Sequence, residues 1–227
     1  MSFAHAFFGF VPRHIPNSLT LFVYDLLSRH GRLPSFSAPV PGCGSGEDLP
    51  ETREPVLIED QRRRAQEPFG RSTVAHAGCE VIALYNALSA LYGREIIPFP
   101  ELIRLFRHRG MALGGRWGTS PRSLFRFLVV LSRQCPLRIE ATSDLSRFEE
   151  LAERYSCLIL SFFNDGGDIR RGVHTVCLTR TAGGFVAHNL TEDGKPRGPF
   201  SDVTRALANA GGGRARGLYL IGVGKNG

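Results

Sequence analysis

The stretch STVAHAGCEVIALYNALSALYG, residues 72–93, decides how the rest of the chain is organised. A short polar approach and a small-residue turn lead into about four turns of apolar sequence, which predicts a helix that begins near Cys79. Apolar side chains cover most of its circumference, so we expect the helix to be buried inside a domain. Gly93 is suited to end it.

Cys79 lies in the first turn of this predicted helix. At that position the helix dipole and unpaired main-chain N–H groups favour the thiolate, which is the nucleophilic form of cysteine. The alternative is a small core residue, because free cysteine is among the most buried residue types. Partners elsewhere in the chain must decide between a reactive and a structural thiol.

The composition is that of a globular protein with a moderate positive charge. The chain has 227 residues, 42% of them hydrophobic, which is enough for one large domain or for one domain with an appendage. Its 28 Lys and Arg against 21 Asp and Glu give a net charge of +7. No aromatic residues are regularly interleaved among the basic ones, so we expect a solvated basic face and no nucleic-acid partner.

Cysteine usage and hydropathy limit the cellular compartments in which we expect the protein. The five cysteines are odd in number, widely spread and without a Cys-x-x-Cys pair, which disfavours a disulfide framework and a structural zinc site. No apolar run approaches the roughly 18 residues of a membrane span, and the first ten residues lack the early positive charges of a signal peptide. We predict a cytoplasmic protein with no transmembrane segment, cofactor or metal.

Residues 1–60 form an N-terminal part that differs from the remainder. Ser18 can cap a helix that runs to about Arg29, and residues 34–50 are rich in proline and glycine, as in a linker. We expect this helix to pack on the main domain, residues 61–227, through an apolar stripe. The stripe consists of Leu19, Phe22, Val23, Leu26 and Leu27.

The main domain begins with helices and continues as a sheet. A short strand is expected at residues 56–58, and helices at residues 100–108, 121–132, 144–155 and from residue 202. Strands are expected at residues 137–140, 157–163, 172–179, 184–190 and 217–223. Helices followed by antiparallel strands predict an α+β fold.

A cysteine nucleophile needs a base and a third group that orients the base. His174 lies inside a predicted strand, and Asn189 lies on the neighbouring strand of the same hairpin, where it can return to the level of His174. Cys79, His174 and Asn189 are therefore the candidate catalytic residues. Taken singly, His174 is more typical of a satisfied sheet histidine, and Asn189 of a turn residue.

A metal site is a further alternative. His76, Cys79, His174 and His188 carry suitable ligand atoms. The spacing of His76 and Cys79, with two residues between them, is a weak signal for a metal site. We therefore predict no metal.

The order of these motifs resembles the papain-like cysteine peptidases, in particular the branch of bacteriocin-exporter leader peptidase domains and their free-standing relatives. Gly78-Cys79 opens a buried helix, His174 follows Gly172-Val173, and Asn189 ends the next strand. Two further stretches, residues 118–124 and 203–207, resemble a turn into a helix and a short helix in that branch. The likeness spans about residues 62–224. It implies a papain-like fold and a cysteine peptidase that acts on a peptide or protein through a Cys79 thioester.

Two departures from the family pattern mark this chain as divergent. The family commonly has Gln six residues before its cysteine, as a donor to the oxyanion, whereas this chain has Thr73. The Cys79 main-chain N–H is still available as a donor, and the hydroxyl of Thr73 or Ser72 is the candidate second donor to the oxyanion. Glu80 and Val81 stand where Gly and Pro are usual, so a carboxylate lies beside the nucleophile. A papain-like binding module with weak or no turnover is therefore the alternative function. The substrate and the oligomeric state are left open.

Overall fold

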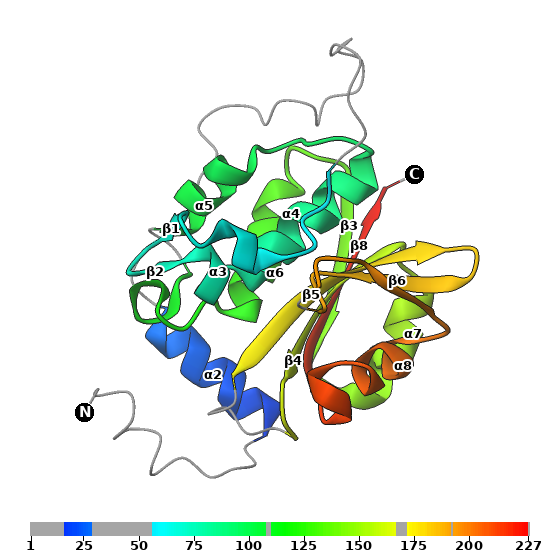
Figure 1. Cartoon of the computed structure of the whole chain (residues 1–227). Helices are drawn as coiled ribbons and strands as arrows, with labels where there is room; N and C mark the ends of the chain where they lie inside the picture. Colours follow the sequence, from blue (N-terminus) through cyan, green and yellow to red (C-terminus); the bar gives the residue numbers. More distant parts are fainter. Residues whose placement is uncertain (1–15, 29–55, 108–109, 167–171, 192, 227) are drawn as a thin grey trace.

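The fold is a mixed arrangement of helices around one antiparallel sheet (Figure 1). A computed structural model of the chain describes residues 16–28, 56–107, 110–166, 172–191 and 193–226. The large sheet has six strands in the order β3-β8-β4-β5-β6-β7, and neighbouring strands run antiparallel. The α+β fold predicted from the order of elements is therefore confirmed.

The sheet strands include the apolar runs expected from the sequence. They are β3 (Leu137–Thr142), β4 (Cys157–Phe163), β5 (Val173–Thr181), β6 (Gly184–His188), β7 (Arg197–Phe200) and β8 (Arg216–Lys225). Every residue of β4 is buried because the strand is central and both of its faces are covered. A separate two-stranded ribbon, β1 (Pro68–Phe69) with β2 (Ser72–Thr73), precedes the cysteine helix.

Helices cover both faces of the sheet, and two apolar cores result. On one face lie α2 (Asn17–Leu27), α3 (Val74–Ala77), α4 (Cys79–Tyr92), α5 (Phe99–Arg107) and α6 (Pro121–Leu131). On the other lie α7 (Phe148–Glu153) and α8 (Val203–Ala208), as Figure 1 shows. Helix α4 is apolar on nearly all sides and lies inside the larger core, and Gly93 ends it in the left-handed conformation, φ 68°.

Helix α2 packs on the domain as predicted, but with a different face. The buried residues are Thr20, Leu21, Tyr24 and Asp25, whereas Leu19, Phe22 and Leu26 are about half exposed. The Asp25 carboxylate accepts hydrogen bonds from Ser120 Oγ at 2.8 Å and from Arg126 Nη2 at 3.0 Å. Of the predicted apolar stripe, Leu27 packs on the larger core, but Leu19, Phe22 and Leu26 do not face it, because these polar contacts with α6 and its N-cap orient the helix.

The strand predicted at residues 56–58 is also wrong. The Asn86 side chain in α4 accepts from the Ile58 N–H at 2.8 Å and donates to the Ile58 carbonyl at 2.9 Å. These two bonds satisfy the main chain that a strand partner would otherwise satisfy. Residues 56–60 therefore form an irregular segment next to the larger core, and the Ile58 side chain is buried in that core.

Several predictions concern parts of the chain outside the described residues. The proline- and glycine-rich linker at residues 34–50 and the first ten residues belong to this group.

Cys135 is disulfide-bonded, a bond that the sequence analysis did not predict, while Cys79, Cys157 and Cys177 are free. Among the described residues, no helix is long and apolar enough to cross a membrane.

Candidate functional site

The Cys79 thiol lies at the first residue of α4, which Gly78 alone separates from α3. The close junction needs glycine at this position, because a Cβ there would lie 2.7 Å from the Val74 carbonyl oxygen. Only 6% of Cys79 is exposed. The start of the apolar α4 thus fixes the sulfur at the boundary between the helical part and the sheet.

The thiol has a carboxylate as its hydrogen-bond partner. Cys79 Sγ donates to Glu80 Oε2 at 3.3 Å. Burial, the charge of Glu80 and this hydrogen bond raise the pKa of the thiol well above its usual value, although main-chain N–H groups of Thr175 and Glu80 act in the opposite direction. The expectation that the helix terminus favours the thiolate is therefore not met in the resting site, because burial outweighs it.

Glu80 is held in an enclosed position. Only 2% of the residue is exposed, and burial raises the pKa of its carboxyl to about 7. The main-chain N–H of Thr119 binds the carboxylate, and Gly118 lies so close that a Cβ there would be 2.9 Å from Glu80 Oε2. The loop before α6 therefore wraps the carboxyl and holds it against the thiol.

His174 occupies the second position of β5 and is half-buried. Its Nε2 lies 2.7 Å from the Asn189 main-chain oxygen, an acceptor, so Nε2 carries the hydrogen and Nδ1 is left as the basic nitrogen. The ring makes a T-shaped contact with Phe162, with centroids 5.6 Å apart. Burial lowers the pKa of His174 below its usual value.

Asn189 meets His174 through its main chain, while its side chain points to another partner. The Asn189 carboxamide accepts from the Gln61 N–H at 3.1 Å and donates to Gln61 Oε1 at 3.2 Å. Its backbone is left-handed, with φ 60°. Asn189 therefore orients the imidazole with its carbonyl oxygen, not with the carboxamide that the sequence analysis assumed.

Helix α4 and strand β5 bring Cys79 close to the chain segment that holds His174. The Thr175 N–H binds the sulfur, and Thr175 is the next residue after His174. Strand β6 pairs with β5 only from Cys177 onward, so this N–H lies at the margin of the sheet. Within the described part of the chain, the Cys79 thiol bonds to Glu80 and not to His174.

Alternation along β5 explains why the two side chains do not meet directly. Cys177 packs in the core that contains α4, whereas Val176 packs in the core under α7 and α8. His174 shares its face with Val176 and with Phe162. In the described residues, the Cys79 thiol therefore bonds to Glu80, and the His174 ring bonds to the Asn189 carbonyl on the other face of the strand.

A cavity of about 280 Å³ opens beside the thiol. It is bounded by the start of α4, the start of β5, the loop before α6 and helix α2. Its lining residues are Tyr24, His76, Ala77, Cys79, Glu80, Arg116, Trp117, Gly118, Gly172 and Val173. The cavity therefore has aromatic walls, a thiol and a carboxyl, with the exposed His76 and Arg116 among its lining residues.

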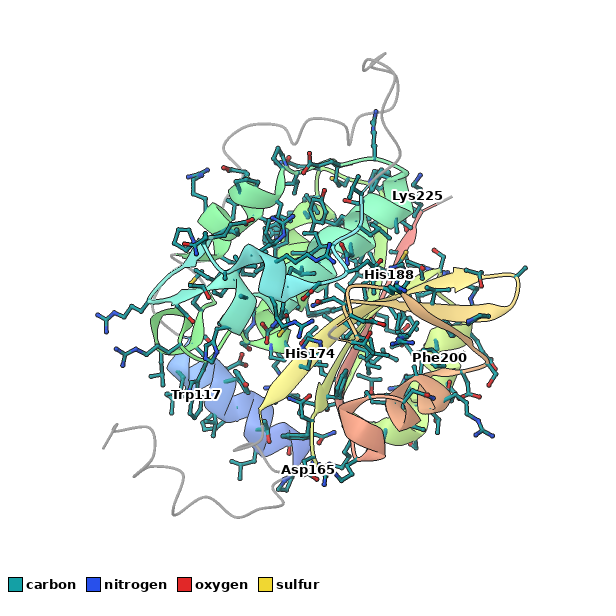
Figure 2. All side chains as sticks on the ribbon, in the orientation of Figure 1. Trp117, Asp165, His174, His188, Phe200 and Lys225 are labelled. Carbon is teal, nitrogen blue, oxygen red and sulfur yellow. The ribbon has the colours of Figure 1, made fainter. Side chains whose placement is uncertain are left out.

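Hydrogen bonds with Glu59 and Gln61 hold the end of β6, next to Asn189. Glu59 lies 2.6 Å from His188 Nδ1 and accepts from the Asn189 N–H at 3.2 Å, while His188 Nε2 lies 2.8 Å from Thr179 Oγ1. Gln61 also donates to the Ala75 carbonyl in α3 at 3.0 Å. The segment before β1 thus ties the α3 turn to β6. Figure 2 shows His174 and His188 on the two neighbouring strands β5 and β6.

The remaining candidates lie apart from the thiol. Thr73 precedes α3 at the end of β2, and it is not among the residues that line the cavity. In the described ranges, no group of three His, Cys, Asp or Glu side chains could hold a metal ion. His188, named in the metal alternative, is bonded to Glu59 and Thr179.

Comparison with known proteins does not assign the chain. No family model, curated protein or solved structure matches it. Function must therefore be argued from the site itself.

Sequence reasoning missed several residues that shape this site. Glu59 and Gln61 belong to no motif, and only the fold brings them to Asn189. Tyr24 comes from the segment that was set apart as an appendage. Glu80 was noted as a neighbour of the nucleophile, but its contact with the thiol was not predicted.

Proposed function

We propose that this protein is a cysteine peptidase, or a related acyl-transferring enzyme, with Cys79 as its nucleophile. The observation that carries the proposal is the position of the Cys79 thiol, which lies beside a cavity at the start of α4. The start of α4 packs on strand β5, which also holds His174 in a fixed orientation. A nucleophile, a basic nitrogen and a substrate-sized space are the parts that acyl transfer requires. The resemblance to papain-like peptidases, with the same residues in the same chain order, supports this proposal.

The proposed reaction proceeds through a thioester. Cys79 Sγ loses its proton and attacks the carbonyl carbon of an amide, and the C–N bond then breaks as the amine takes up a proton. Water hydrolyses the thioester and restores the thiol. His174 exchanges protons through Nδ1, and the Cys79 main-chain N–H at the start of α4 is the proposed donor to the oxyanion.

A binding module with little turnover is the second candidate. The raised pKa of the Cys79 thiol favours it, because a protonated thiol is a poor nucleophile. In that case the cavity would hold a peptide without cleaving it.

The experiment is a digest of a peptide mixture followed by mass spectrometry, with Cys79→Ala and Cys157→Ala compared with the unchanged protein. Cys157 is a matched control, because it is also a free, buried cysteine but does not line the cavity. We expect cleavage that Cys79→Ala abolishes and Cys157→Ala retains. Peptide binding without cleavage would favour the binding module, and cleavage by Cys79→Ala would show that the nucleophile is misassigned.

A further inference from the structure

We infer that Glu80 is the group that takes the proton from Cys79 when the nucleophile is formed. The inference rests on Cys79 being the nucleophile of the proposed function, and it adds a catalytic residue to that site. It replaces His174 in the proton transfers of the thioester-forming step only.

The hydrogen-bond geometry supports this role. The thiol donates to Glu80 Oε2 at 3.3 Å, which is the direction in which the proton would travel. His174 bonds to the Asn189 carbonyl and lies on the other face of β5. For the first transfer, the carboxylate is therefore in contact with the proton and the imidazole is not.

The enclosure of Glu80 keeps the carboxyl in that position. Gly118 leaves no space on one side, the Thr119 N–H binds the carboxylate, and 2% of the residue is exposed. A carboxyl needed only as a surface charge would not require a loop to close around it. Both residues also line the cavity, so a substrate carbonyl placed there can reach the sulfur.

Proton affinities point the same way. Burial raises the pKa of the Glu80 carboxyl to about 7 and lowers the pKa of His174 below its usual value. Burial thus makes Glu80 a stronger base than an ordinary carboxylate and His174 a weaker base than an ordinary histidine. The other ionisable groups that face the pair are Tyr24 from α2, His76 from α3 and Arg116 from the loop before α6. The Tyr24 hydroxyl stays protonated, because burial and the neighbouring Glu80 raise its pKa.

Cys79, Glu80 and the substrate account for every proton and electron pair of the proposed step. The S–H bond breaks, its electron pair stays on sulfur, and the proton moves to Glu80 Oε2. The thiolate then attacks the substrate carbonyl carbon, and the leaving nitrogen takes the proton back from Glu80 as the C–N bond breaks. The carboxylate is thereby restored for the next cycle.

The test is the rate of Cys79 alkylation by iodoacetamide as a function of pH, measured by mass spectrometry of the Cys79 peptide. It compares the unchanged protein, Glu80→Gln, which is nearly isosteric and cannot take the proton, and His174→Ala. Cys157 alkylation in each protein reports any unfolding. In the unchanged protein we expect the rate to rise as Glu80 ionises, around a pH of about 7, and then to level off, because one proton is shared by the pair.

Glu80→Gln should lose that step and rise about tenfold per pH unit instead, since only direct ionisation of the thiol is left. His174→Ala should keep the step. A step that survives Glu80→Gln and disappears in His174→Ala would overturn the inference and leave the proposed function intact. A Glu80→Gln protein that reacts faster at every pH would also overturn it, since Glu80 would then only restrain the thiol. If Cys79 reacts no faster than Cys157 at any pH, the proposed function itself fails.

Discussion

Replacing Leu21 by alanine tests how α2 is attached to the domain. Leu21 is fully buried in the core that contains α4, whereas Leu26, one and a half turns further along the same helix, is 51% exposed. Leu21→Ala and Leu26→Ala remove the same atoms and change the helix propensity equally. Any difference between them therefore reports packing.

The expected magnitudes are well separated. A buried Leu→Ala change costs roughly 2–5 kcal/mol through lost transfer energy and the cavity that it leaves. An exposed change away from special contacts stays within about 0.5 kcal/mol. In a domain of this size, 1 kcal/mol lowers Tm by about 2–4 °C, so Leu21→Ala should lower it by roughly 4–20 °C.

Urea unfolding followed by circular dichroism and by tryptophan fluorescence measures both variants. Trp117 is the only tryptophan of the chain, and Figure 2 shows it near α2. Its ring centroid lies 6.4 Å from that of Tyr24 in α2. Fluorescence therefore reports the attachment of α2, and circular dichroism reports the whole fold. If Leu26→Ala cost as much as Leu21→Ala, the buried face of α2 would be wrongly assigned.

Three further predictions concern the site and its supports. Burial raises the pKa of the Glu80 carboxyl from 4.5 to about 7 in the fold. Its contribution to the free energy of unfolding is therefore complete below pH 4.5 and falls by about 3 kcal/mol as the pH rises to 7. Glu80→Gln should remove this pH dependence from the free energy of unfolding measured by urea titration. Glu59→Gln should cost about 1–3 kcal/mol, because Glu59 binds His188 at the end of β6 and the N–H of Asn189 just after it. Glu67→Gln, which breaks a surface ion pair, should cost at most about 1 kcal/mol in the same titration. Gly118→Ala should lower Tm more than Gly93→Ala: both glycines have φ 68°, but only at Gly118 would a Cβ meet another group, the Glu80 carboxylate at 2.9 Å.

The parts of the fold that were predictable depend on contacts close in sequence. The buried character of α4 and the β4 strand follow from continuous apolar runs. The buried face of α2 could not be read in this way, because Asp25 is oriented by Ser120 and Arg126, about a hundred residues away. Strand β7 was missed because it is only four residues long and contains Gly and Pro.

The site was predictable to a similar degree. Cys79 at a helix start and His174 in a strand followed from the local pattern, and chain order suggested their association with Asn189. The atoms that interact did not follow, because a pattern of residue types does not distinguish a carboxamide from a main-chain carbonyl. The contact between Glu80 and the thiol depends on Gly118 and Thr119, which only the folded loop brings to the carboxyl.

The place of Tyr24 in the cavity wall has a consequence for the modular organisation of the protein. Composition suggests a unit that begins at residue 61, yet Tyr24 lines the cavity and Asp25 binds the start of α6. The cavity is thus discontinuous in sequence, since one of its walls is encoded ahead of residues 29–55 and the others after them. A fragment that starts after this stretch would contain Cys79 and the sheet but would lack that wall, so the part of the chain that forms the complete cavity extends back at least to α2.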